Sequence, residues 1–258
     1  MLCRRGFLLA GAGGLLAGAA GDALDEAPFR TESGWKPLLN GKDLSGWKSQ
    51  LGWRGVPGRL NEWYATSTVS SAANHPDSLA GGPDGGPIIV NGRETHTTNL
   101  ISDAKFGDHE LYLEFMLVKG SNSGVYLHGL YEVQVFDSYG KTEPLKFGDA
   151  GGIYEYGLDG QKGSGGTPAR TNASRPPGAW QSYRIRFRAP QFDSNGRKTR
   201  RARFERVVYN RVTIHEDVWC DGPTRSAIEI PEAPRNPLML QGDHGPVAYR
   251  NIWFRPVS

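Results

Sequence analysis

Residues 109–118, HELYLEFMLV, alternate between two faces with a period of two residues. Leu111, Leu113, Phe115 and Leu117 share one face, and Glu110, Tyr112, Glu114 and Met116 share the other. An amphipathic helix would instead place apolar residues at i, i+3, i+4 and i+7, and no long stretch of the chain has that spacing. The chain is therefore predicted to fold from β-strands.

Other short segments alternate in the same way and are separated by turn residues. They are PIIV (87–90), TTNLIS (97–102), SGVYLHG (123–129), YEVQVFD (131–137), YRIRFRA (183–189), RVVYNRVTIHEDV (206–218) and PLMLQGDHGPVAYRNIWFRPV (237–257). Many strands without helices predict an all-β fold, a β-sandwich or jelly roll of two antiparallel sheets with one concave, ligand-binding face. The 258 residues contain 10 Phe, 10 Tyr and 7 Trp, enough apolar material for a sizeable core.

Residues 1–28 are predicted to be an export signal and not part of the fold. A charged start with Arg4 and Arg5 precedes an apolar run over 7–20 that is too short to span a membrane. The paired arginines favour a twin-arginine signal, and the alternative is an ordinary secretory signal. We therefore expect one domain over 29–258, exported to the bacterial periplasm or beyond and free of the membrane once the signal is removed.

Cysteine content and charge narrow the function classes. Outside the signal only Cys220 remains, so neither an internal disulfide nor a cysteine-based zinc site is expected. The net charge of +3 gives no argument for a nucleic-acid partner, and the basic run over 197–207 is expected to be a solvated hairpin face. Two segments rich in Gly, Pro and small polar residues, 70–86 and 157–178, are expected to be long loops bordering a site.

The segment YEVQVFDSYG (131–140) carries polar residues in an otherwise apolar strand. If His128-Gly129-Leu130 is a three-residue turn, Tyr126 pairs with Glu132, and Tyr126, Glu132 and Gln134 share one face. A two-residue turn, Gly129-Leu130, would reverse that arrangement, but a glycine inside a three-residue turn with a bulge is common, so the first register is favoured. Aromatic residues beside acids and amides favour a carbohydrate site over a solvated face, because sugar rings stack on aromatic rings and sugar hydroxyls need polar partners.

The spacing Glu132-x-Gln134-x-x-Asp137 also resembles the catalytic strand of laminarinase-type jelly-roll glycosidases. Those enzymes carry acids at all three positions, whereas here the middle residue is an amide. A retaining mechanism needs two carboxyl groups roughly 5–5.5 Å apart, which the short Asp137 side chain puts in doubt.

The closing segment LQGDHGPVAYRN adds Gln241, Asp243, His244 and Arg250. His244 is either a turn residue or a general acid or base, since histidine titrates near neutral pH. Arg250 is either an exposed strand end or a buried cation that meets a carboxylate or a substrate oxygen.

Three aromatic residues are further candidates. Tyr154 follows two glycines and could present its ring to a sugar. Trp47 and Trp180 are expected in the core by default, and Trp180 could also border the sugar. Metal binding has little support: Asp137, Asp149 or Asp243 could bind calcium, but nothing in their spacing requires it, and no cofactor is expected.

Six segments in the same order resemble the 3-keto-disaccharide hydrolase domain family and cover nearly all of residues 29–258. They are WKPLLNGKDLSGW (35–47), NLISDAKFGDHELYLEF (99–115), NSGVYLHGLYEVQVFDSYG (122–140), GGIYEYG (151–157), ASRPPGAWQSYRIRFRAPQFDSNGRK (173–198) and PLMLQGDHGPVAYRNIWFRPV (237–257). The chain departs from the family at YNR (209–211), where an Asn-Gly turn is usual, and in the longer 70–86 segment.

The resemblance implies a concanavalin A-like jelly roll that cleaves glycosides already oxidised at C3. The ketone acidifies the C2 proton, so one base, one acid and donors to an enolate oxygen suffice. Glu132 or His244 would be the base or acid, Gln134, Gln241 and Arg250 would bind hydroxyls and the enolate, and Tyr126, Tyr154 and Trp180 would border the sugar. Asp137 is retained as a substrate-binding candidate.

Such an enzyme would act after a sugar 3-dehydrogenase on an oxidised di- or oligosaccharide. The alternatives are a non-catalytic carbohydrate-binding module on the same fold and a conventional laminarinase-like glycosidase.

Overall fold

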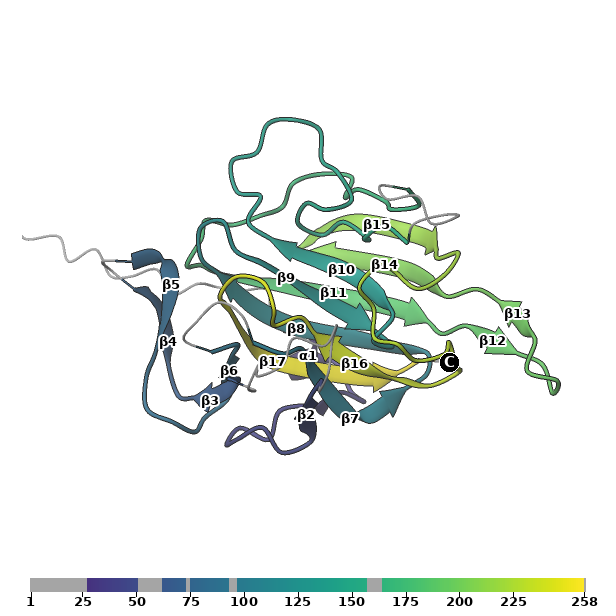
Figure 1. Ribbon diagram of the computed structural model, residues 1–258, viewed down its shortest axis with the longest axis horizontal. Coiled ribbons are helices and arrows are strands. Elements are labelled where there is room, and N and C mark those ends of the chain that lie inside the picture. The colour runs from purple at the N-terminus through teal and green to yellow at the C-terminus, as the bar shows by residue number, and fades with distance from the viewer. Residues whose placement is uncertain (1–26, 51–61, 73–74, 93–96, 157–163, 258) are drawn as a thin grey trace, which may run out of the picture.

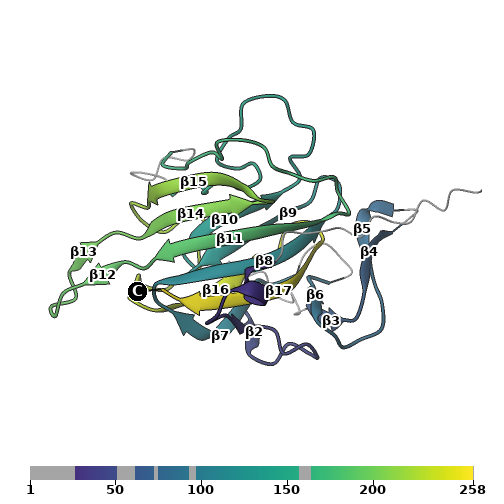
Figure 2. The ribbon, with the colours of Figure 1, turned by 180° about the vertical axis from the view of Figure 1, so that it is seen from behind.

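The alternating segments pair into two stacked antiparallel sheets in the computed structural model, which describes residues 27–50, 62–72, 75–92, 97–156 and 164–257. The larger sheet contains, in spatial order, β15 (Val212–Trp219), β14 (Arg203–Tyr209), β11 (Trp180–Arg188), β8 (His109–Leu117), β17 (Val247–Pro256), β6 (Ile88–Val90) and β3 (Tyr64–Thr66), with β1 (Lys36–Pro37) paired to β17. The smaller sheet contains β10 (Tyr131–Phe136), β9 (Asn122–Leu127), β16 (Asn236–Leu240), β7 (Leu100–Phe106) and β2 (Trp47–Ser49). Figures 1 and 2 show the two layers from opposite sides. The predicted all-β jelly-roll fold is confirmed.

Two further pairs of strands project from this body (Figure 1). One is β12 (Gln191–Phe192) with β13 (Lys198–Arg200), and the other is β4 (Val69–Ala72) with β5 (His75–Gly81). The loop expected over 70–86 is therefore wrong for its first part, because two short strands there pair with each other despite their small polar residues. Of the second expected loop, residues 157–163 lie outside the described residues, and 164–178 form no strand.

The core lies between the two sheets. Side chains alternate between the two faces of β8, so its leucines and Phe115 all point toward the smaller sheet. Leu111, Leu113, Phe115 and Leu117 are each at most 1% exposed and meet the inward residues of the smaller sheet, including Val125 and Val133. Burial of such side chains contributes roughly 1.5–3 kcal/mol each. Trp47 is also buried in this core, as expected.

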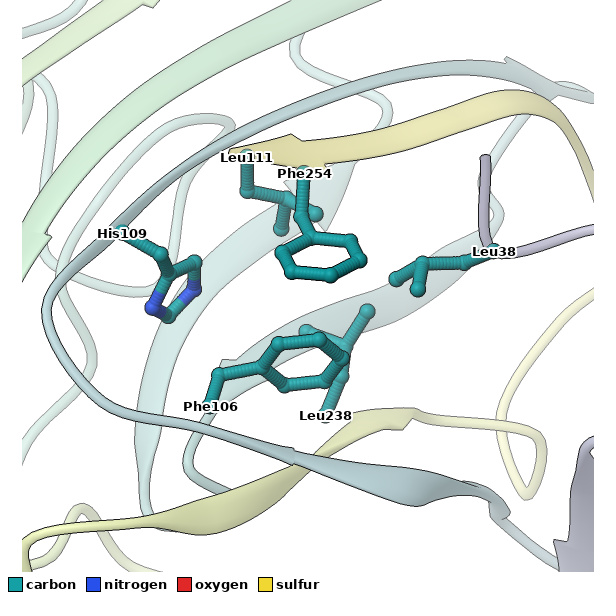
Figure 3. Close-up of a pocket in the computed structure, with 6 residues that line it drawn as sticks. All are labelled: Leu38, Phe106, His109, Leu111, Leu238 and Phe254. Atoms are coloured by element: carbon teal, nitrogen blue, oxygen red, sulfur yellow. The ribbon is translucent and has the colours of Figure 1, made fainter. Parts of the chain in front are cut away.

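A gap in this packing lies near one end of the sandwich (Figure 3). Apolar side chains converge on it from both sheets, with His109 at its edge, and the space between them has no room for a water molecule. They are Leu38, Phe106, Leu111, Leu238 and Phe254. The gap is therefore a packing feature of the core and not a ligand site.

The outer face of the larger sheet is covered by the N-terminal residues of the described chain. The short helix α1 (Pro28–Thr31) places Phe29 in a parallel stack on Trp253, with ring centroids 4.3 Å apart. Glu32 then binds Arg184 with both carboxylate oxygens, at 2.8 and 2.9 Å. This cover explains why the polar face of β8 is buried as completely as its apolar face.

Residues 1–26, which include most of the predicted export signal, lie outside the described residues. Within the part of the chain that is described, no helix is long and apolar enough to cross a membrane.

Candidate functional site

The β9–β10 hairpin determines which polar side chains meet. Its turn is the three-residue form, with Leu127 opposite Tyr131 and Tyr126 opposite Glu132. His128 and Gly129 both have positive φ, 57° and 66°, which lets the chain reverse within three residues. The predicted register is confirmed, and Tyr126, Glu132 and Gln134 lie on the outer face of the smaller sheet.

Glu132 lies across its neighbouring strand on that face. A Cβ atom added to Gly124 would lie 2.1 Å from Glu132 Oε1, so the carboxylate occupies the space that this glycine leaves open. Glu132 is 1% exposed, and its Oε1 atom has no hydrogen-bond partner among the described residues. A buried carboxylate oxygen without a partner is costly, and such groups are concentrated at functional sites.

The surroundings of Glu132 favour its neutral form. The pKa of Glu132 is raised to about 8, mainly by burial; the Tyr126 hydroxyl opposes this shift, the negative charge of Asp243 adds to it, and the Arg225 guanidinium opposes it. The carboxyl group thus titrates near neutral pH, where a general base can both accept and release a proton.

Strand β16 and the loop after it bring a second group of side chains to Glu132. Gln241 follows β16 and donates its backbone N–H to the Gly124 carbonyl at 2.9 Å. The Oε1 atoms of Gln134 and Gln241 are buried and accept no hydrogen bond from the described residues. These two amides therefore keep hydrogen-bonding capacity that no described residue uses.

His244 belongs to the same loop and is held by its neighbour. Its Nδ1 atom lies 2.8 Å from Asp243 Oδ1, with the aspartate buried and the His244 side chain 47% exposed. Asp243 is also close enough to Glu132 to raise its pKa. An exposed imidazole thus bonds to the carboxylate that acts electrostatically on Glu132.

Residues 151–154 extend the smaller sheet beyond β10. Ile153 bridges Val133, and Tyr154 donates its N–H to the Glu132 carbonyl at 3.2 Å, so Tyr154 lies beside Glu132 on the outer face. The Tyr154 hydroxyl accepts a hydrogen bond from Arg225 Nη2 at 3.2 Å, and Arg225 Nε lies 2.9 Å from Glu155 Oε1. The Arg225 guanidinium and the Tyr154 phenol therefore flank the Glu132 carboxylate.

Trp180 and Arg250 are not part of this group, and placing them in one site with Glu132 is wrong. Trp180 pairs with Met116 on the outer face of the larger sheet. Arg250 lies 4.0 Å above the Trp180 ring, and its Nε is 2.5 Å from Glu114 Oε2. The whole core separates them from the smaller sheet's outer face, because strand parity places both on the side of β8 that faces away from it.

Tyr126 and Asp137, also predicted to contact a sugar, lie near this group of side chains but make other contacts. Tyr126 is 1% exposed, covered by Ile228 and Met239, so its ring cannot stack on a sugar, and its hydroxyl instead acts on Glu132. Asp137 accepts hydrogen bonds from the backbone N–H groups of Gly120 at 2.8 Å and Tyr139 at 3.3 Å, which ties two turns together.

Arg225 and the role of Gly124 were not predicted from the sequence, and Asp243, although noted in the closing segment, was assigned no role beyond that of a calcium candidate. Arg225 lies in a segment without alternation, so no local pattern marks it. Gly124 could have been noticed as a glycine inside a strand, which indicates a close approach of another group.

The calcium candidates do not form a cluster. Asp149 binds Lys141 Nζ with both oxygens at 2.8 Å, and Asp137 and Asp243 are engaged as described above. Among the described residues, no three His, Cys, Asp or Glu side chains are grouped so that they could hold a metal ion.

Comparisons with known proteins agree with this architecture. The family described as "3-keto-alpha-glucoside-1,2-lyase-like domain" matches residues 34–255. A candidate glycosyl hydrolase from Parabacteroides distasonis is 26% identical, with a TM-score of 0.60 over 87% of this chain and 84% of that one. A second such protein from the same organism is 14% identical, with a TM-score of 0.52 over 87% and 94%, and shows the fold alone. No curated protein matches the chain in sequence.

Proposed function

Because the chain belongs to the 3-keto-alpha-glucoside-1,2-lyase-like family, and is thus carbohydrate-active, we propose that it cleaves glycosides that carry a ketone at C3. The base removes the proton from C2, which the neighbouring ketone acidifies, and an enolate forms. The C1–O bond then breaks as a C1–C2 double bond forms, and the leaving oxygen takes a proton from an acid. Addition of water to the double bond would convert this elimination into net hydrolysis.

The observation that carries the proposal is the environment of Glu132. It is a buried carboxyl group with a pKa of about 8, and no described residue forms a hydrogen bond to its Oε1 atom. A base with a pKa near the working pH suits proton abstraction next to a carbonyl group. Elimination needs only one base, so the amide at Gln134 is compatible with it.

The neighbouring groups supply the remaining roles in this proposal. Arg225 and the Tyr154 hydroxyl, linked at 3.2 Å, would stabilise the charge on the enolate oxygen. The free amide oxygens of Gln134 and Gln241 would accept hydrogen bonds from sugar hydroxyls. His244, exposed and supported by Asp243, would donate the proton to the leaving oxygen.

The test compares a 3-keto-disaccharide with the same disaccharide before oxidation. Wild-type protein should release monosaccharide or keto-glycal from the keto form alone. Glu132→Gln, which keeps the shape and removes the base, should lower kcat by roughly 10²-fold or more. Glu114→Gln is the matched control, since Glu114 is a buried carboxylate on the opposite sheet, and it should retain wild-type kcat.

Three results would overturn the proposal or part of it. Cleavage of the unoxidised disaccharide would indicate a conventional glycosidase. Binding of either sugar without turnover would indicate a carbohydrate-binding module. Wild-type turnover by Glu132→Gln would remove Glu132 as the base.

The proposed substrate also implies a setting. A dehydrogenase that oxidises the sugar at C3 must act first, since the ketone is needed to acidify C2. We further propose that the protein works after export, in the bacterial periplasm or outside the cell.

A further inference from the structure

A hollow of about 320 Å³ opens on the outer face of the larger sheet, on the opposite side of the sandwich from Glu132. Small-molecule sites usually have volumes of roughly 300–1,000 Å³. Pro28 of α1 forms one edge of the hollow, and the side chains that line the rest come from β8, β11, β14 and the turn after β14. They are Tyr112, Ser182, Arg184, Arg206, Val208 and Arg211.

Two buried hydroxyl groups lie at the bottom of this hollow. Tyr112 is 2% exposed and Ser182 is 5% exposed. The Tyr112 hydroxyl donates its proton to Glu114 Oε1 at 3.0 Å and accepts a hydrogen bond from the Ser182 hydroxyl, so it is the Ser182 oxygen that keeps the capacity to accept a hydrogen bond. Hydroxyl groups of this kind suit a ligand that itself carries hydroxyls.

The walls of the hollow are cationic. Three of its lining residues are arginines and none is a carboxylate. Arg184 is neutralised by Glu32 and Glu110, at 2.8 and 3.1 Å, and Arg211 is also engaged in an interaction, so neither is counted as a charge open to a ligand.

Arg206 differs from Arg184 because its neighbouring charges are engaged elsewhere. Opposite it across the strands lie Arg186 and Glu216. Arg186 binds Glu205, and Glu216 binds Arg170 at 2.6 Å. No carboxylate of the described residues forms an ion pair with Arg206, so its charge is available to a ligand.

We propose that this hollow binds a small polyhydroxylated anion, namely a sugar acid or a sugar phosphate. Arg206 would hold the carboxylate or phosphate group, for which the planar guanidinium fork is suited. The Ser182 oxygen, held in place by its bond to Tyr112, would accept a hydrogen bond from a hydroxyl of the sugar. The site is separate from the one at Glu132 and does not depend on the reaction proposed there.

The experiment is calorimetric titration of the full chain with glucuronate, glucose 6-phosphate, inorganic phosphate and glucose. We expect at least one of the two sugar anions to bind, more tightly than inorganic phosphate and glucose, and the comparison of the two identifies the preferred anionic group. Arg206→Gln should raise Kd about tenfold or more, because a hydrogen bond to a charged group is lost. Arg200→Gln, which removes an exposed arginine from the projecting β12–β13 pair, should leave Kd unchanged.

Arg206→Glu gives a second variant and should abolish binding, and added salt should weaken binding to the wild type. Arg206→Gln should leave turnover of a 3-keto-disaccharide as in the wild type. The proposal is overturned if neither sugar anion binds, if glucose or inorganic phosphate binds equally well, or if Arg200→Gln weakens binding as much as Arg206→Gln.

Discussion

Replacing Glu132 by Gln should stabilise the protein relative to the wild type, and this gain in the free energy of unfolding should grow as the pH rises. The pKa of Glu132 is about 8, against 4.5 for an ordinary glutamate, and burial is the main cause. The folded state therefore holds a proton between these two pH values that the unfolded state has lost. The free energy of unfolding of the wild type decreases across this window: the contribution is complete below pH 4.5 and is lost as the pH rises through 8.

The magnitude follows from the two pKa values. One pKa unit corresponds to about 1.4 kcal/mol, so ionising Glu132 inside the fold costs at most about 5 kcal/mol. Glutamine is neutral at every pH and avoids this cost. The difference in free energy of unfolding, variant minus wild type, should grow by about 3–5 kcal/mol between pH 5 and pH 9.

Urea denaturation at a series of pH values measures this difference. The buried histidines His109, His128 and His215, whose pKa values burial lowers to about 4, are present in both proteins and cancel. Glu32→Gln is the control. Burial pushes the pKa of Glu32 upward, but its bonds to Arg184 and Arg255 outweigh this and hold it below 4.5, so that variant should show a constant difference over pH 5–9. A constant difference for Glu132→Gln as well would refute the reasoning.

Three further perturbations test other parts of the structure. Gly124→Ala should displace the carboxylate that lies 2.1 Å from the added Cβ and lower kcat at least tenfold in a folded protein, whereas Gly222→Ala, which meets nothing within 4 Å, should be neutral in the same assay. The wild-type kcat/KM on a 3-keto-disaccharide should rise about tenfold per pH unit and level off near pH 8, as Glu132 loses its proton; a profile without that rise would contradict its role as the base. Glu110→Ala should cost about 1.5–3 kcal/mol in urea denaturation, because Arg184 and Arg255 lose their bonds to a buried carboxylate but keep those to Glu32; a loss below 1 kcal/mol would show that Glu110 contributes little to this network.

Local sequence patterns were enough to predict most of the strands and to favour the correct pairing of β9 with β10. The alternation over 109–118 was sufficient to predict which residues of β8 face the core, because side chains on a strand alternate by geometry alone. The glycine in the turn after His128 was likewise enough to favour the hairpin register that places Glu132 and Gln134 on one face. The small polar residues over 70–86 wrongly predicted a loop throughout, since two short strands can pair with each other without an apolar pattern.

The sequence by itself thus determined that the chain is all-β, and it favoured the hairpin register in which Glu132, Gln134 and Tyr126 share a face, since both follow from neighbours along the chain. It could not determine which strands from distant segments would lie beside them. Only the tertiary structure separated Trp180 and Arg250 from Glu132 by the thickness of the core, and brought Arg225 and Asp243 to it. The physical reason is that sheet order and loop crossings depend on packing over the whole chain, and the pKa of Glu132 depends in turn on the burial that this packing creates.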